Sequence, residues 1–271
     1  MTTVRDELAS GAEALARAGC DTPRLDAELL LAEVLGSDRA GLVIASSDRL
    51  TGDQRTRYMA LLTRRAMREP IAYILGRREF RRLSFAVDPR VLIPRPETEL
   101  LVEVGVELPF GVRVADVGTG SGAVALALKD ERPDLAVTGI ERDQSALSVA
   151  RANAQRLRLD VRWVEADLLD EGVAYDALLA NLPYVSETEE LPPEVREFEP
   201  ASALFAGVDG LDAIRALVAS ASDRDEVSTL ALEIGLGQAD AVTALLGDAG
   251  FTSVERRQDL AGHDRVVVGR R

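Results

Sequence analysis

The spacing of hydrophobic positions changes near residue 75 of the chain. Before that point apolar residues recur three and four positions apart, a pattern typical of helices with one buried face. Further along, short aliphatic runs alternate with amphipathic segments, which predicts parallel strands joined by helices. The last two strands follow one another directly and are expected to pair. The pattern predicts an α/β fold, with a doubly wound Rossmann-like sheet, an antiparallel edge strand and a small N-terminal helical domain.

These changes of pattern place the expected domain boundaries. Residues 1–75 form the helical domain, residues 76–95 a hairpin and linker, and residues 96–271 the sheet domain. Within the helical domain, Thr22 and Pro23 are expected to begin a helix, with the threonine hydroxyl as its cap. A further helix is expected over residues 53–68, with Tyr58, Leu61, Leu62 and Met67 facing inward.

A glycine-rich turn follows the first strand of the predicted sheet. The strand covers residues 112–117 and includes Asp116, and it is followed by Gly118, Thr119, Gly120, Ser121 and Gly122. Glycines at alternate positions let the backbone turn tightly and approach a ligand closely. The spacing is G-x-G-x-G, unlike the G-x-G-x-x-G of dinucleotide sites. Taken alone, the turn is also consistent with a simple tight connection.

Acidic residues follow the next two strands. Glu141 ends the second strand, about 20 residues after the glycines, where a carboxylate can accept hydrogen bonds from both ribose hydroxyls. After the third strand, Asp167 can accept from an adenine amino group, with Leu168 against the ring. Singly, these acids could cap a helix or face solvent. Their order along the sheet favours a crevice for an adenosyl ligand.

The fourth strand ends in Asn181, Leu182, Pro183 and Tyr184. Such a corner can hold a planar NH₂ group, because the Asn181 side-chain oxygen and the Leu182 carbonyl can accept its two N–H bonds. Tyr184 can pack its ring on the flat amide or base. The alternative is an ordinary strand-ending turn, for which Asn and Pro are common. The stretch after it, residues 185–200, is expected to be a long functional loop.

Composition narrows the classes of function. The chain has 46 acidic and 32 basic residues, a net charge of −14, which disfavours a nucleic-acid partner. One cysteine, Cys20, excludes an internal disulfide and is expected to be buried, and one histidine, His263, makes a zinc site unexpected. No apolar run is long enough to span a membrane. We expect a cytoplasmic monomer without a metal.

Several motifs together resemble the HemK/PrmC family of release factor glutamine methyltransferases. They are residues 95–99, the glycine turn with Asp116, residues 181–184, residues 198–200 and residues 259–265. The resemblance implies a class I methyltransferase fold. It also implies that S-adenosylmethionine is the donor, with S-adenosylhomocysteine as product, and that Gly118–Gly122, Glu141, Leu168 and Asn181 hold it. The implied acceptor is the N5 amide of the glutamine in the Gly-Gly-Gln motif of class-1 release factors.

The chain departs from the family at Leu182, where proline is usual. The role expected there belongs to the backbone carbonyl, which leucine also supplies, so we expect activity to survive. Other acceptors stay open at this point: a glutamine of a ribosomal protein, or an exocyclic amino group of adenine or guanine. A nucleotide-binding module without catalysis would leave residues 181–184 unexplained. The helical domain is expected to recognise the protein substrate.

Overall fold

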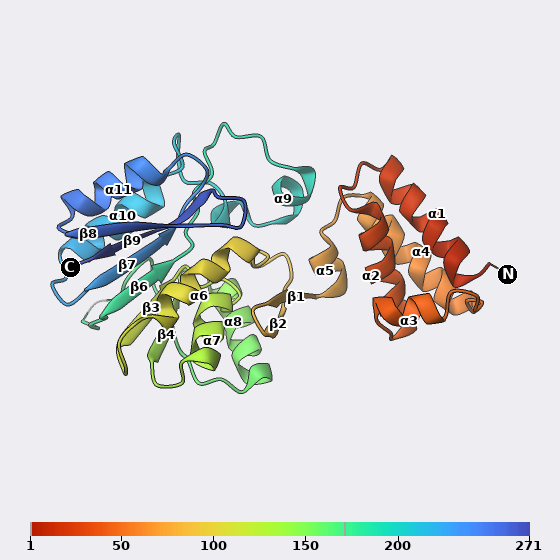
Figure 1. Ribbon diagram of the computed structural model, residues 1–271, viewed down its shortest axis with the longest axis horizontal. Helices are drawn as coiled ribbons and strands as arrows, with labels where there is room; N and C mark the ends of the chain where they lie inside the picture. Colours follow the sequence, from red (N-terminus) through yellow and green to blue (C-terminus); the bar gives the residue numbers. More distant parts are fainter. Residues whose placement is uncertain (1, 171) are drawn as a thin grey trace. The chain divides into compact units, whose positions relative to one another are not determined.

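The computed structural model describes residues 2–170 and 172–271 (Figure 1). The chain separates into two compact units, which we treat one at a time. The helical unit comprises the residues up to Gly76 together with Leu191–Phe198, and the sheet unit comprises Arg77–Glu190 and Glu199–Arg271. No helix among the described residues is both long enough and apolar enough to cross a bilayer.

Among the described residues, the helical unit contains six helices, and all of them except α9 contribute side chains to its apolar core. The helices are α1 (Val4–Arg17), α2 (Pro23–Leu35), α3 (Arg39–Ile44), α4 (Gly52–Ala66), α5 (Ile71–Leu75) and α9 (Pro193–Phe198). Threonine hydroxyls begin two of them, since Thr3 and Thr51 each accept from a backbone N–H three residues on. The core contains Leu15, Leu30 and Tyr58, which are entirely buried.

Two expectations for this unit are wrong in detail. Thr22 does not cap α2 with its hydroxyl, which donates instead to the Asp26 carboxylate at 2.9 Å. Tyr58 and Leu62 are buried as expected, but α4 ends at Ala66 and Met67 is 69% exposed. One residue beyond a helix end, a side chain no longer follows the helical spacing that would turn it inward.

A short helix also stands in the stretch that was expected to be a loop. α9 belongs to the helical unit, where its Glu194 lies between two arginines of the α4 end. Arg65 binds Glu194 at 3.1 Å and Asp26 of α2 at 2.7 Å, and Arg68 binds Glu194 at 2.6 Å. The side chains of Arg65 and Asp26 are 7% and 3% exposed. The pairing at Glu194 therefore joins a buried ion pair to a segment distant in sequence.

The sheet unit begins with a hairpin, β1 (Arg77–Phe80) and β2 (Leu83–Ala86), whose strands pair antiparallel. The 3-10 helix η1 (Pro96–Thr98) then leads into α6 (Glu99–Val106). The remaining strands are β3 (Arg113–Val117), β4 (Ala136–Glu141), β5 (Arg162–Glu165), β6 (Ala177–Ala180), β7 (Thr229–Glu233), β8 (Ser253–Gln258) and β9 (Asp264–Arg270). The remaining helices are α7 (Ala123–Glu131), α8 (Gln144–Leu157), η2 (Ala201–Ala203), α10 (Asp212–Ser222) and α11 (Ala239–Asp248).

Seven strands form one sheet in the order β5-β4-β3-β6-β7-β9-β8. The strands from β5 to β7 are parallel, and β9 runs antiparallel to both of its neighbours, β7 and β8. Figure 1 shows α10 and α11 on one face of the sheet and α6, α7 and α8 on the other. The predicted doubly wound α/β fold is confirmed. The strand order reverses between β3 and β6. Sheets of this kind form their ligand crevice at such a reversal.

Candidate active site

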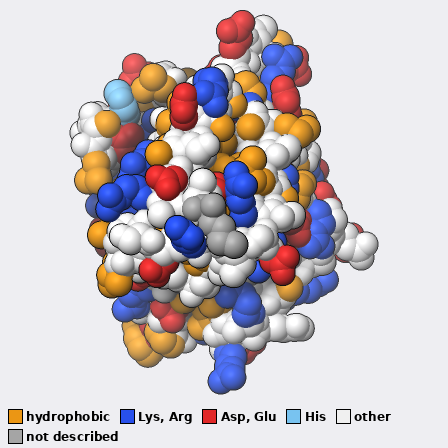
Figure 2. Space-filling view, turned by 90° about the vertical axis from the view of Figure 1, so that its right-hand side faces the viewer, with side chains coloured by type: hydrophobic (Ala, Val, Ile, Leu, Met, Phe, Trp, Pro, Cys, Tyr) orange, Lys and Arg blue, Asp and Glu red, His pale blue; other side chains and the backbone are white. Residues whose placement is uncertain are grey.

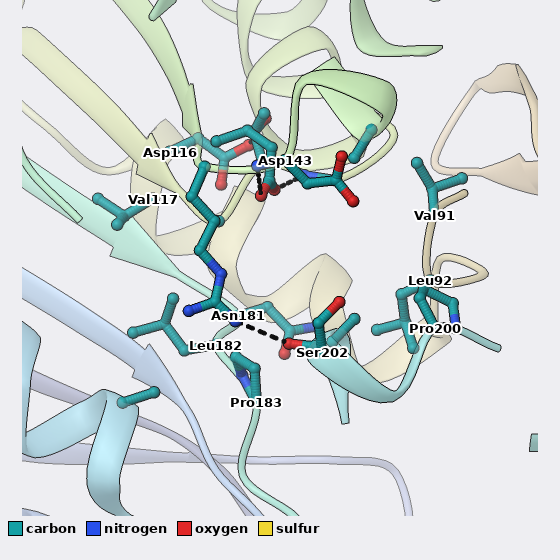
Figure 3. Close-up of a pocket in the computed structure, with 18 of the residues that line it drawn as sticks. Val91, Leu92, Asp116, Val117, Asp143, Asn181, Leu182, Pro183, Pro200 and Ser202 are labelled. Atoms are coloured by element: carbon teal, nitrogen blue, oxygen red, sulfur yellow. Dashed lines mark hydrogen bonds between the residues drawn. The ribbon is translucent and has the colours of Figure 1, made fainter. Parts of the chain in front are cut away.

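A cavity of about 450 Å³ lies at this point of the sheet (Figure 3). Most of the residues predicted to form the site line it, namely Asp116, Gly118, Thr119, Gly120, Ser121, Glu141, Asp167, Leu168, Asn181, Leu182 and Pro183. Gly122 and Tyr184 do not line it. The parallel strands β3, β4, β5 and β6 bring these residues together, because each strand ends at the same edge of the sheet.

The glycine turn has a backbone that other residues adopt at a cost. Gly118, Gly120 and Gly122 have φ of 72°, 53° and 81°, all in the left-handed region. A Cβ on Gly118 would lie 2.9 Å from Cδ2 of Leu182, so the turn packs directly on the residue after Asn181. Gly122 matters for another reason. A Cβ there would meet the ring of Trp163 at 3.0 Å, away from the cavity lining.

Asp116 fastens the turn to the helix that follows it. Its Oδ2 accepts a hydrogen bond from the Thr119 hydroxyl at 2.5 Å and one from the Ala125 N–H at 3.0 Å. The side chain is buried, and burial raises its pKa to about 6, although both hydrogen bonds act in the opposite direction. The carboxylate is therefore retained in spite of a desolvation cost, at a position where it fixes the shape of the turn.

Glu141 holds the other side of the turn. One carboxylate oxygen accepts from the Gly120 N–H and the other from the Asp143 N–H, both at 3.1 Å. Each oxygen of a carboxylate has a further lone pair, so both can still accept from a ligand. Asp167 is exposed, and the adjacent Leu168 has a φ of 68°, an uncommon conformation for leucine that points to a local constraint.

Asn181 is oriented by a hydrogen bond from its own amide. Its Nδ2 donates to the Thr98 hydroxyl oxygen at 3.0 Å, which leaves Oδ1 as the acceptor that the amide can offer at the cavity. Leu182 is buried, while Pro183 and Tyr184 are half-buried. The Tyr184 hydroxyl donates to Oε1 of Glu233 at 3.4 Å, and burial raises the pKa of Tyr184, so the phenol keeps its proton.

Sequence reasoning assigned no role to two polar residues at this corner, Thr98 and Glu233. Thr98 is 4% exposed and Glu233 is 1% exposed. Both stand where a strand or helix ends: Thr98 at the end of η1 and Glu233 at the end of β7. The sequence shows only that Glu233 stands at the end of an aliphatic run; its burial, which is rare for Glu without a partner, is seen in the structure.

Two of the motifs that carry the family resemblance meet at the cavity wall. Arg95 binds the Glu199 carboxylate at 2.5 Å, and Glu199 also accepts from the Ile93 N–H at 3.2 Å. The neighbouring Pro94 and Pro200 both line the cavity. This ion pair, with a Glu199 side chain that is 1% exposed, therefore joins two distant segments that shape the pocket.

Family models match most of the chain. The PrmC N-terminal domain model matches residues 6–76 and the methyltransferase small domain model matches residues 96–200. The chain is 43% identical to a release factor glutamine methyltransferase of Burkholderia pseudomallei, over 100% of this chain and 99% of that protein. The chain belongs to the release factor glutamine methyltransferase family. A second member, from Geobacter sulfurreducens, is 40% identical over 94% and 92% of the two chains.

The predicted family and the prediction of a methyltransferase are thereby confirmed. Solved structures agree on the fold. The hMettl16 catalytic domain in complex with a MAT2A 3′UTR hairpin superposes with a TM-score of 0.58 at 17% identity, over 78% of this chain and 81% of that one. A T. Thermophilus 16S rRNA methyltransferase in complex with AdoMet and guanosine gives a TM-score of 0.52 at 18% identity, over 72% and 49%.

Proposed function

We propose that this protein transfers a methyl group from S-adenosylmethionine to the side-chain amide nitrogen of the glutamine in the Gly-Gly-Gln motif of class-1 release factors. The observation that carries the proposal is the orientation of Asn181. Its NH₂ group is engaged by Thr98, so its oxygen is the group left to accept an N–H bond at the cavity. A donated N–H is what a glutamine amide brings to such a site.

The residues of the cavity fit S-adenosylmethionine. Its volume of about 450 Å³ falls within the usual range for small-ligand sites. We propose that the turn from Gly118 to Gly122 and Asp116 shape the methionine end, that Glu141 accepts from the ribose, and that Asp167 and Leu168 contact the adenine. When bound, this molecule supplies a methyl group on a positively charged sulfur. Gly118 has no Cβ, and a Cβ at this position would lie 2.9 Å from the side chain of Leu182.

The protein's own contribution is placement of a poor nucleophile. The nitrogen of a carboxamide is weakly nucleophilic because its lone pair is delocalised into the carbonyl. We propose that Asn181 Oδ1 and the Leu182 carbonyl accept its two N–H bonds, with Pro183 holding the corner rigid and Tyr184, which packs on the apolar core outside the cavity lining, supporting it. Fixed orientation can supply about 7–11 kcal/mol of a barrier in favourable cases. The two acceptors also favour the positive charge that grows on nitrogen.

The charge of the molecule supports a protein acceptor over a nucleic acid. Its formal net charge is −14, and acidic and basic side chains are interspersed over the face drawn in Figure 2. Nucleic-acid binding depends on neutralising several phosphates with clustered basic residues. The surface in Figure 2 shows no broad basic region of that kind.

The test is to locate the transferred methyl group. Purified protein is incubated with S-adenosylmethionine labelled in the methyl group and, in separate reactions, with a class-1 release factor, ribosomal protein and RNA. We expect label in the release factor alone, at the glutamine of its Gly-Gly-Gln motif. A release factor with alanine in place of that glutamine serves as the matched control. Label in RNA, or label that persists in the alanine control, would contradict the proposal.

We further propose that the N-terminal helical domain predicted over residues 1–75 recognises the protein substrate, that residues 76–95 serve as hairpin and linker, and that residues 96–271 carry the reaction. Every residue that lines the cavity belongs to the sheet unit. Removing residues 1–70 is therefore expected to abolish methylation of the release factor and to leave S-adenosylmethionine binding intact, measured by calorimetry. Equal methylation by the shortened chain would contradict this role.

A further inference from the structure

One buried carboxylate near the cavity has no part in the reaction described so far. Glu233 is the last residue of β7, and the register of the sheet pairs Ala180 of β6 with Leu232 of β7. The next residues along the two strands are Asn181 and Glu233. Because paired residues of parallel strands direct their side chains to the same face, the sheet itself places these two side chains near one another.

The hydrogen bonds at this point have a fixed direction. Asn181 Nδ2 donates to the Thr98 oxygen, so the single proton of the Thr98 hydroxyl is available for another acceptor. The Thr98 side chain is near enough to the Glu233 carboxyl to lower its pKa, and toward a carboxylate the Thr98 hydroxyl can only donate. The Tyr184 hydroxyl donates to Oε1 of the same carboxylate at 3.4 Å. A carboxylate accepts only, and it therefore sets the direction of both hydroxyls.

The surroundings of Glu233 show that stability alone does not account for it. The residue is 1% exposed, and its Oε2 has no hydrogen bond of ordinary geometry to the described residues. The neighbouring charges are those of Glu97 and Arg265, of opposite sign, and burial raises the Glu233 pKa to about 7. A buried, incompletely paired carboxylate costs free energy of folding. Residues of that kind are often retained for function.

We propose that Glu233 is a positioning residue for the methyl acceptor: through Thr98 it holds the Asn181 amide with Oδ1 turned to the substrate, and it holds the Tyr184 hydroxyl directly. This role depends on the direction of the hydrogen bonds. If the carboxylate were lost, Thr98 could donate to Asn181 Oδ1 instead, and the amide could then turn by half a revolution. Its NH₂ group would then face the substrate amide, donor against donor. This role rests on the proposed function of Asn181.

A pair of substitutions at Thr98 tests the connection without changing the shape of the site. Thr98→Val keeps the volume but removes the hydroxyl, and Thr98→Ser keeps the hydroxyl. We expect Thr98→Val to lower kcat by about 100-fold, the size of effect that follows from misplacing a reacting group. Thr98→Ser is expected to restore most of the rate, and Thr98→Val to change the affinity for S-adenosylmethionine, measured by calorimetry, far less than it changes kcat.

The dependence of kcat on pH tests Glu233 itself. At saturating S-adenosylmethionine, we expect kcat of the parent protein to fall as pH falls through about 7, because a protonated Glu233 can donate and no longer fixes Thr98. Glu233→Gln should lower kcat about 10-fold and remove this acid limb. The neutral side chain should leave the thermal midpoint unchanged or higher, since a buried charge is removed.

The outcomes separate this proposal from the function on which it rests. A Thr98→Val variant with the kcat of the parent protein, or a Glu233→Gln variant with the same acid limb, overturns the positioning role. Failure of the parent protein to label release factor contradicts the proposed acceptor instead. The variants are then compared on whichever acceptor is labelled, because the network orients Asn181 whatever molecule presents the nitrogen. If Glu233→Gln fails to fold, the Thr98 pair still decides.

Discussion

At the scale of single residues, the site depends on which end of one amide faces the cavity. Asn181 donates to Thr98 from Nδ2, and this hydrogen bond distinguishes an acceptor corner from a donor corner. A leucine at position 182 does not disturb that arrangement. Leu182 is buried against Gly118, and the role proposed for it belongs to its backbone carbonyl. We therefore expect the geometry at Asn181 to survive without the proline that is usual in the family.

Replacing Asn181 tests the acceptor directly. Asn181→Ala removes Oδ1, and we expect kcat to fall by about 1,000-fold, as for other preorganised polar groups aimed at a developing charge. The dissociation constant for S-adenosylmethionine should change only modestly, since most of the cavity lining remains. Single-turnover methylation of release factor and calorimetry with the donor measure the two quantities. A variant with a nearly normal rate would contradict the positioning mechanism.

Asp116 gives a prediction for pH. Its folded-state pKa of about 6 lies above the ordinary value of 3.8, so the buried charge destabilises the fold at pH 7. Asp116→Asn keeps an oxygen for Thr119 and Ala125, and should raise the free energy of unfolding at pH 7 by up to about 3 kcal/mol. The folded state binds the extra proton, so this gain should shrink as pH falls through 6 and vanish below 4.

Urea unfolding of Asp116→Asn and of the parent protein across this range of pH measures the difference. If the gain in free energy of unfolding stays constant down to pH 4, the buried charge of Asp116 is not its cause. The same variant reports on the site, because Asp116 shapes the glycine turn through two hydrogen bonds that asparagine can also accept. We therefore expect Asp116→Asn to bind the donor more tightly than Asp116→Ala.

Residues whose role depends on their position directly after a strand were predictable from the sequence. Gly118, Glu141 and Asn181 each follow a strand, and parallel strands end at one edge, so their meeting in one cavity follows from the pattern alone. Thr98 and Glu233 were not predictable in this way. Their importance depends on the register between β6 and β7 and on the direction of hydrogen bonds, and neither is written in local spacing.

At the scale of elements, the glycine turn and the strand end after β6 form one packed unit. Gly118→Ala would add a Cβ 2.9 Å from Leu182 at a φ of 72°. Gly111→Ala is a matched control, since Gly111 has a φ of 74° in the same unit and nothing within 4 Å of its Cβ position. Both should lose about 1 kcal/mol of stability from backbone strain.

The two glycine variants should differ in activity. Gly118→Ala presses on Leu182 and therefore displaces the acceptor corner as well as the turn, so we expect weaker donor binding and a lower kcat. Gly111→Ala should keep both at the level of the parent protein. Thermal unfolding, calorimetry with S-adenosylmethionine and methylation of release factor give the three readouts. Equal activity in the two variants would mean that the contact between Gly118 and Leu182 is dispensable.

Element type was easier to predict than element ends. The alternation of aliphatic runs with amphipathic segments identified the parallel strands and the helices between them. It missed α9, because two prolines and a run of acids resemble a loop, and its helix is stabilised by contacts of Glu194 with distant arginines. It also placed Met67 inside, because a spacing rule cannot detect that α4 has already ended.

At the scale of the whole molecule, a buried ion pair in the helical unit holds a segment that lies far along the chain. Arg65→Ala would leave the Asp26 carboxylate, 3% exposed, without its partner, and would release one of two contacts to Glu194. We expect a loss of about 3–5 kcal/mol in the stability of this unit. Arg64→Ala is the control, because the Arg64 side chain is 45% exposed and its pair with Glu69 should contribute about 1 kcal/mol or less.

Urea unfolding followed by circular dichroism measures the two losses, and limited proteolysis reports on residues 185–198. We expect faster cleavage there in Arg65→Ala than in Arg64→Ala, because α9 is held less firmly without the Arg65 contact. Similar stability and similar cleavage in the two variants would show that the buried pair does not anchor this segment.

The lone cysteine has a practical consequence. Cys20 is 6% exposed, its sulfur donates to the Arg65 carbonyl at 3.5 Å, and burial raises its pKa. As the chain's single thiol, it is shielded from alkylating reagents while the surrounding helices stay closed. The rate at which a colorimetric thiol reagent modifies the native sequence therefore counts opening events of the N-terminal helices, with no engineered label.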